Sequence, residues 1–160
     1  MINLKLELKD RAKISAMLKT FLNKEHSSAI AESVWQISGT STTTLYATNG
    51  HMLVRLLLKL EDNCDFDAVT GELAGEYFTK LENLLCSTVS DTHNTPAKEK
   101  RINAGYLTLA LKAFDCMQRI YKPSKFHAVD MSINSGDQGI ILSVDNNCYS
   151  LHVIIMPMRK

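Results

Sequence analysis

Few side chains in this sequence have the type and spacing that chemistry requires. Its five histidines are scattered, without the HExxH spacing or the paired cysteines of a metal site. They are His26, His51, His93, His127 and His152. His127 and His152 fall in strand-like runs, where a structural histidine with its hydrogen bonds satisfied is the usual case. We therefore expect no metal ion and no cofactor.

The cysteines give equally little support to catalysis. Four are present without a CxxC motif, and reduced thiols in a cytoplasm are their expected state: Cys64, Cys86, Cys116 and Cys148. Cys116 lies beside the core face of a predicted helix, but no base that could activate it as a nucleophile is evident. No glycine-rich phosphate loop occurs. An enzyme using Cys116 or a histidine is the weakest hypothesis, and we expect no catalytic residue.

The end of the chain is its most unusual stretch. Residues 151–156 form an apolar run with β-branched side chains at its centre, which is typical of a buried strand. Pro157 ends that strand because proline has no amide hydrogen to donate. Two methionines flank this proline close to the end of the chain, where polar residues are more usual. The Met-Pro-Met segment either fills a core or lines an adaptable apolar groove.

Composition limits the class of protein that this sequence can encode. The chain has 160 residues, of which 45% are hydrophobic and 22% are charged, as in one globular domain. A net charge of +1 makes no case by itself for a nucleic acid or a membrane. The first residues carry too many charges, and their apolar run is too short, for a secretory or membrane segment. We expect a cytoplasmic protein without a membrane partner.

The first part of the chain predicts a strand, a helix and three more strands. Ile2, Leu4, Leu6 and Leu8 alternate with polar residues, which indicates a strand. Asp10 is a candidate cap for the helix that follows, whose apolar stripe consists of Ile14, Met17, Leu18, Phe21 and Leu22. The three strand-like runs are 33–38, 43–48 and 51–60, and Asn49-Gly50 is a strong hairpin signal between the last two.

The second part repeats this order after an insertion. We assign residues 62–95 to an inserted segment that packs on the domain, with a helix over 72–85 that either seals a sheet edge or forms a subunit interface. A strand over 98–102, a helix over 103–120 and three strands over 126–133, 139–144 and the tail follow. Residues 1–160 are thus predicted to form a single α+β domain with a duplicated strand-helix-three-strand unit. Its two helices pack on antiparallel sheets.

Three stretches resemble a domain of the bacterial DNA sliding clamp, the beta subunit of DNA polymerase III. Ala47-Thr-Asn-Gly-His-Met-Leu53 resembles the clamp's Ala-Thr-Asp-Gly-His-Arg-Leu. Ile102-Asn-Ala-Gly-Tyr-Leu107 resembles its Phe-Asn-Val-Ser-Tyr-Leu, and the stretch from Val153 to Arg159 resembles its terminal Val-Val-Met-Pro-Met-Arg. The resemblance covers nearly the whole chain except the insertion. It implies a DNA-clamp-like fold and a protein without enzymatic activity.

The resemblance also implies a role for the unusual tail. In the clamp family, the first and last of these stretches form an apolar groove that binds short peptides of polymerases and repair proteins. Carried over by position, the groove would consist of Thr48, Gly50, His51, Leu53, Ile154, Ile155, Met156, Pro157, Met158 and Arg159. Methionine side chains suit such a site because they adapt to several partners.

This sequence departs from the family in its groove and in its size. Asn49 replaces an aspartate, Met52 replaces an arginine and the chain ends in Lys160. A family protomer strings three such domains together, and two protomers close a six-domain ring, whereas this sequence contains one. In the clamp the groove segments come from adjacent domains, so here they are expected to meet across a subunit interface. A homo-oligomeric ring of about six copies would provide that interface.

Clamp helices line the hole and face duplex DNA without reading its sequence. Six basic residues on the outer faces of the two predicted helices could do so here: Lys13, Lys19, Lys24, Lys112, Arg119 and Lys122. Asp115 shares that side and would weaken the contact. Alternatively these lysines simply form a solvated helix face.

Two functions remain open. The first is a processivity factor that assembles into a ring around duplex DNA and tethers a DNA polymerase or another protein with a clamp-binding peptide. The second is a single-domain adaptor or decoy that binds such peptides, or a clamp subunit, without encircling DNA.

Overall fold

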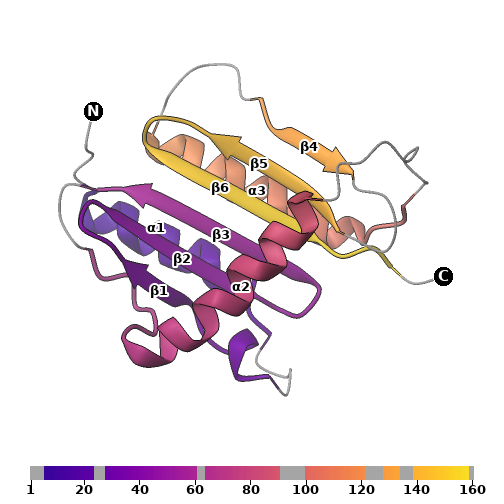
Figure 1. The fold of residues 1–160 in the computed structure, drawn as a ribbon. Helices are drawn as coiled ribbons and strands as arrows, with labels where there is room; N and C mark the ends of the chain where they lie inside the picture. The colour runs from indigo at the N-terminus through magenta and orange to yellow at the C-terminus, as the bar shows by residue number, and fades with distance from the viewer. Residues whose placement is uncertain are drawn as a thin grey trace.

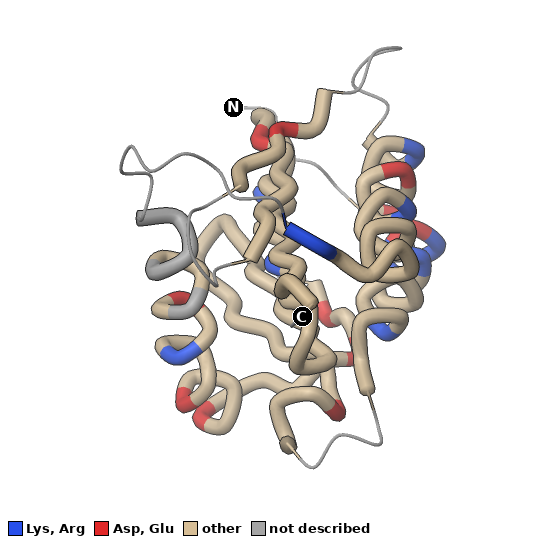
Figure 2. Tube along the Cα trace, turned by 90° about the vertical axis from the view of Figure 1, so that its right-hand side faces the viewer, with Lys and Arg blue, Asp and Glu red and all other residues tan. Residues whose placement is uncertain are grey.

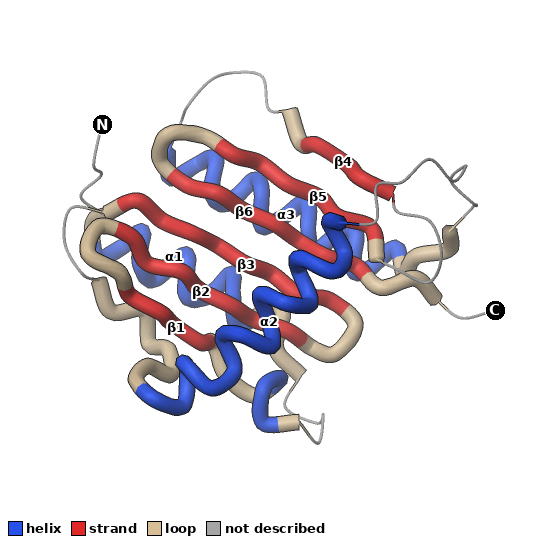
Figure 3. Tube along the Cα trace, viewed as in Figure 1, coloured by secondary structure: helices blue, strands red, loops and turns tan. Residues whose placement is uncertain are grey.

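The computed structural model describes residues 6–23, 28–60, 64–90, 100–121, 128–133 and 139–158, without the side chains of residues 84 and 87–90. Its strands form one six-stranded antiparallel sheet in the order β1-β2-β3-β6-β5-β4 (Figures 1 and 3). The strands are β1 (Trp35–Ser38), β2 (Thr42–Thr48), β3 (Met52–Lys59), β4 (Asp130–Ile133), β5 (Ile140–Asp145) and β6 (Tyr149–Ile155). The helices are α1 (Leu8–Lys19), α2 (Glu72–Ser90) and α3 (Ala104–Tyr121), with a short 3-10 helix, η1 (Ala29–Ala31).

The helices cover both faces of the sheet, giving three layers (Figure 2). Helices α1 and α3 lie side by side on one face, and Ile14, Phe114 and Met117 pack there against Val54 and Val153 of the central strands. Helix α2 crosses the opposite face. The architecture is α+β, as the sequence predicts. Its single sheet and third layer were not predicted.

Helix α2 occupies a different place from the one expected. Its buried residues Ala74, Leu81 and Leu85 pack on Trp35 and Leu53, which point to the sheet face opposite α1 and α3. The expectation that this helix seals a sheet edge is therefore wrong. The segment just before it lies at an edge instead, since Val69 bridges to β1.

The two halves of the chain repeat one motif. Each half supplies a helix and a three-stranded antiparallel meander, α1-β1-β2-β3 and α3-β4-β5-β6. The meanders join through the central antiparallel pair of β3 and β6, which runs from Met52 opposite Ile155 to Leu58 opposite Tyr149. The predicted duplication is confirmed for these elements.

The strand predicted at the start of each half is not observed within the described residues. Leu6 and Glu7 precede α1 without pairing, and Leu8 is the first residue of that helix, with 81% of its surface exposed. Asp10 lies in the first helical turn, where its charge suits the helix dipole, instead of at the cap. Residues 100–102 are likewise outside any strand, and residues 1–5 and 98–99 lie outside the described ranges.

Candidate functional site

The hairpin between β2 and β3 is held in shape by its own side chains. The Asn49 Oδ1 accepts hydrogen bonds from the backbone N–H groups of His51 at 2.9 Å and Met52 at 2.8 Å. Gly50 has φ 85°, a conformation that glycine adopts without a steric penalty. A carboxylate oxygen could accept the same two hydrogen bonds. An aspartate at position 49, as in the clamp stretch that this one resembles, would therefore hold the loop in the same way. His51 is exposed at the tip of the loop.

The tail runs directly past this hairpin. Beyond the last β3–β6 pair, the Met156 N–H donates to the His51 carbonyl at 2.9 Å, and the Met158 N–H donates to the Arg101 carbonyl at 2.8 Å. Two backbone hydrogen bonds thus hold the segment in place after Pro157 has ended the strand. The side chains of Met156 and Met158 are 37% and 55% exposed.

The start of α3 completes the arrangement. The Asn103 Oδ1 accepts the Gly105 N–H at 2.8 Å and thereby caps the helix. One turn later, the Tyr106 ring stacks on the His51 ring, with centroids 5.9 Å apart and planes 17° apart. We call this surface the hairpin-tail site; it comprises Thr48, Gly50, His51, Tyr106, Met156, Pro157 and Met158.

The two segments of the predicted groove meet within one chain. The expectation that they meet across a subunit interface is therefore wrong. The reason is that β6 returns beside β3, which brings the end of the chain to the hairpin tip. Arg101 and Tyr106 were not among the predicted site residues, although Tyr106 lies in one of the three stretches that carry the resemblance.

Three of the ten predicted groove residues belong to the core. Leu53, Ile154 and Ile155 are only 3%, 2% and 0% exposed. Leu53 and Ile154 pack under α2, whereas Ile155 points to the opposite face and packs in the layer of α1 and α3. Because helices cover both faces of the sheet, neither orientation leaves these side chains free to line a groove. Arg159 lies outside the described residues.

Three of the six predicted DNA-facing residues are paired with acids. The Lys13 ammonium lies 3.2 Å from the Asp10 carboxylate, and the Arg119 guanidinium lies 2.9 Å from that of Asp115. Lys19 pairs with Asp67. Lys112 is exposed and makes no ion pair with any described residue, while Lys24 and Lys122 lie outside the described ranges. These pairs reduce the positive field that α1 and α3 present.

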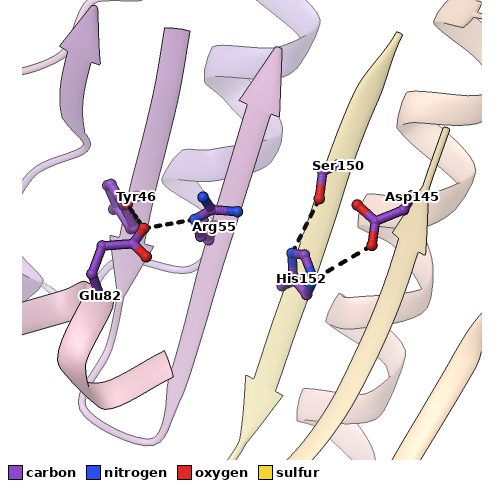
Figure 4. Close-up of polar contacts among 6 residues, drawn as sticks. All are labelled: Tyr46, Arg55, Glu82, Asp145, Ser150 and His152. Atoms are coloured by element: carbon purple, nitrogen blue, oxygen red, sulfur yellow. Dashed lines mark hydrogen bonds and ion pairs between the residues drawn. The ribbon is translucent and has the colours of Figure 1, made fainter. Parts of the chain in front are cut away.

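A polar cluster fixes α2 to the sheet. Glu82 of α2 accepts a hydrogen bond from the Tyr46 hydroxyl and pairs with the Arg55 Nε at 2.7 Å (Figure 4). Burial, followed by the hydrogen bond to Glu82, raises the pKa of Tyr46 well above its ordinary value. Burial alone would lower the pKa of Arg55, but the hydrogen bonds to Glu82 and Tyr46 outweigh it and raise that pKa. Both groups therefore keep their protons at neutral pH.

A second cluster combines a serine, a histidine and an aspartate, the residue types of a hydrolase triad. The Ser150 Oγ lies 3.3 Å from the His152 Nδ1, and the Asp145 carboxylate lies 3.8 Å from the His152 Nε2 (Figure 4). The second distance is too long for a hydrogen bond, and Asp145 is 68% exposed. Burial lowers the pKa of His152, although Asp145 opposes this shift. The cluster lacks a positioned carboxylate, so a structural histidine fits better than a catalytic one.

The thiol of Cys116 and the side chains that could bind a metal ion are further candidates for chemistry. Burial raises the pKa of the Cys116 thiol, which reduces its reactive thiolate form. Within the described ranges, no three His, Cys, Asp or Glu side chains come together to hold a metal ion. The described helices include none with the length and apolarity needed to cross a membrane.

Solved structures that match this chain include two described as DNA polymerase III beta chains. One is a DNA polymerase III beta chain of Streptococcus pneumoniae, with 15% identity, a TM-score of 0.32, and coverage of 100% of this chain and 32% of that one. The other is described as a DNA polymerase III beta subunit of Eubacterium rectale, with 9% identity, a TM-score of 0.28, and coverage of 100% and 33%. This chain thus spans about a third of either structure. No family model and no curated protein matches it.

Proposed function

We propose that this protein is a clamp-like tethering module without enzymatic activity, which binds short apolar peptides of replication proteins at the hairpin-tail site. One observation carries the proposal. The three stretches that resemble the clamp are separated in sequence, yet His51 contacts both Tyr106 and Met156 in the structure. A peptide site made within one chain needs no neighbouring subunit. This favours the adaptor over the ring.

The chemistry of the site suits an apolar peptide. Met156 and Met158 are unbranched, exposed and held by backbone hydrogen bonds on either side of Pro157, so their side chains can adjust to a ligand while the backbone stays fixed. His51 and Tyr106 add an aromatic edge that can also hydrogen bond with a peptide backbone. Apolar anchors with a few polar groups at the rim are the usual composition of such sites.

A ring around duplex DNA in the cytoplasm is the second candidate. The side-by-side placement of α1 and α3 on one face favours it, because a clamp needs two such helices facing the hole. The ion pairs of Lys13, Lys19 and Arg119 count against it, since they lower the charge available for phosphates. The ring also requires a homo-oligomer, whereas the adaptor does not.

A peptide-binding experiment tests the hairpin-tail site. Short fluorescent peptides with Leu and Phe anchors are titrated with the wild type and with Met158→Glu, and Leu73→Glu on α2 serves as a matched control because Leu73 is 50% exposed. We expect Met158→Glu to weaken binding about tenfold or more, as for a central interface residue, and Leu73→Glu to leave it unchanged. Equal binding by all three proteins would refute the hairpin-tail site.

The DNA arm of the experiment uses circular and linear duplexes. Retention on circular DNA that is lost when the DNA is cut would establish a ring. Lys112→Glu should then shorten retention and reduce its salt dependence, because Lys112 is exposed and, of the predicted DNA-facing residues within the described ranges, is the one without an ion pair to a described acid. Peptide binding without DNA retention would identify the adaptor.

A further inference from the structure

The two edges of the sheet differ. At β1, the Gln36 N–H donates to the Val69 carbonyl and the Val69 N–H donates to the Val34 carbonyl, both at 2.8 Å. The segment before α2 thus already occupies the outer edge of β1, as an isolated parallel bridge. At the other edge, β4 pairs with β5 alone, and no other described segment adds a strand beside it (Figure 3). Among the described residues, the sheet can be extended only at β4.

Strand β4 also carries apolar side chains that the domain does not cover. Met131 is 56% exposed and Ile133 is 44% exposed. Met131 lies opposite Leu142, whose side chain packs in the layer of α1 and α3, so both point to that face. An edge strand with free backbone groups and apolar side chains favours pairing with another strand.

We propose that β4 pairs with β4 of a second copy of this chain, antiparallel and around a two-fold axis perpendicular to the sheet. Such an axis keeps the faces of the two sheets continuous. Side chains that lie opposite each other across the contact therefore belong to the same face. The axis passes between Ser132 of one copy and Ser132 of the partner subunit. In this register, Met131 of each copy packs against the Ile133 of the partner subunit. Two six-stranded sheets thus become one continuous sheet.

The choice of a second copy follows from the asymmetry of the edges. A head-to-tail contact would join β4 to the next copy's β1, which would require Val69 to leave its two hydrogen bonds. The β4–β4 contact displaces no segment within the described ranges and is self-complementary, since it buries Met131 against Ile133 twice. It uses up the free edge of both copies, so the assembly closes as a dimer and cannot grow into a ring.

The short strand limits the strength of this contact. Four residues in β4 provide few backbone hydrogen bonds. An interface of this size is typical of weak, reversible association. The dimer therefore forms over the micromolar range and depends on concentration. It does not rest on peptide binding at the hairpin-tail site.

Sedimentation velocity over a range of concentrations tests the contact. We expect twice the monomer mass at high concentration for the wild type, and a monomer for Met131→Glu and for Ile133→Lys. The double variant should dimerise with an affinity about tenfold higher than that of either single variant, since each Glu then faces a Lys across the axis. Leu73→Glu on α2, a matched exposed leucine, should dimerise normally. A wild type that stays monomeric, a six-copy assembly, unchanged single variants, or no recovery in the double variant would each overturn the proposal.

Cysteine crosslinking tests the register independently of affinity. In a Cys86→Ser background, which removes the exposed native thiol, Ser132→Cys should form a disulfide-linked dimer under mild oxidation because the two equivalent residues face each other. Asp130→Cys, on the same strand and face, should not, because its equivalent lies at the far end of the paired strand. Equal crosslinking of the two variants would contradict the β4–β4 register.

Discussion

Replacement of Leu81 by alanine tests whether α2 is part of the core. Leu81 lies on the buried face of α2. It is 5% exposed and belongs to the same core cluster as Trp35, Leu53 and Ile154 of the sheet. The substitution removes three carbon atoms, for which the transfer free energy alone is about 2.4 kcal/mol at about 0.8 kcal/mol per group. The cavity left behind adds to this, so we expect a loss of about 3 kcal/mol in the free energy of unfolding. Since the whole domain is expected to have only about 5 to 15 kcal/mol, the loss is large.

Urea unfolding followed by circular dichroism measures the effect. With an m value of about 2 kcal/mol per molar urea, the midpoint should fall by about 1.5 M. Leu73→Ala is the matched control, because it makes the same chemical change on the same helix at a residue that is 50% exposed. It should cost less than about 1 kcal/mol. Midpoints that fall equally little in both variants would refute the docking of α2 on the sheet, and would revive the hypothesis that this helix forms a subunit interface.

Substitutions at three further positions, one of them with a rescuing second substitution, test other contacts. Burial lowers the pKa of His152 in the folded protein, so protonation favours the unfolded chain. The contribution of His152 to the free energy of unfolding should be complete above its unfolded pKa of about 6.5. It should be lost as the pH falls through the lower folded pKa. His152→Gln should reduce this loss in melting temperature between about pH 7.5 and about pH 5. Gly139→Ala should cost about 1 to 3 kcal/mol in urea unfolding, since its new Cβ would lie 2.9 Å from the Ile155 carbonyl oxygen. Glu82→Ala should cost a similar about 1 to 3 kcal/mol, because it leaves the guanidinium of Arg55 without its acid, and Arg55→Met in the same protein should recover part of that loss.

Periodicity in the sequence predicted most elements but not their partners. The stripe containing Ile14, Met17 and Leu18 did identify the buried face of α1, and Asn49-Gly50 did mark a hairpin. The alternation at residues 2–8 was misleading at its end, since Leu8 continues the apolar pattern yet begins a helix and is exposed. A local pattern reports that a face is apolar. It does not report which layer of the fold will cover it.

The same limit explains the unpredicted position of α2. The leucines of residues 72–85 did indicate an amphipathic helix, and the structure extends it to Ser90. The strands, however, also carried a second apolar set, including Trp35, Leu53 and Ile154, on the face away from α1 and α3. Apolar residues on both faces of a strand indicate a sheet that is covered twice. This signal was present in the sequence and would have placed the helix on that face.

The end of the β3–β6 pairing separates the predicted groove residues of the tail that are exposed from those that are buried. Up to Ile155, every residue of β6 has a partner in β3, and the last three side chains before the tail, Val153, Ile154 and Ile155, are buried in the core. From Met156 onward the pairing stops, Pro157 prevents its continuation, and the methionine side chains are exposed. A stretch that resembles a binding groove can therefore contain both core residues and exposed residues. The residues before Met156 build this domain, and only those after the ladder remain available to a partner.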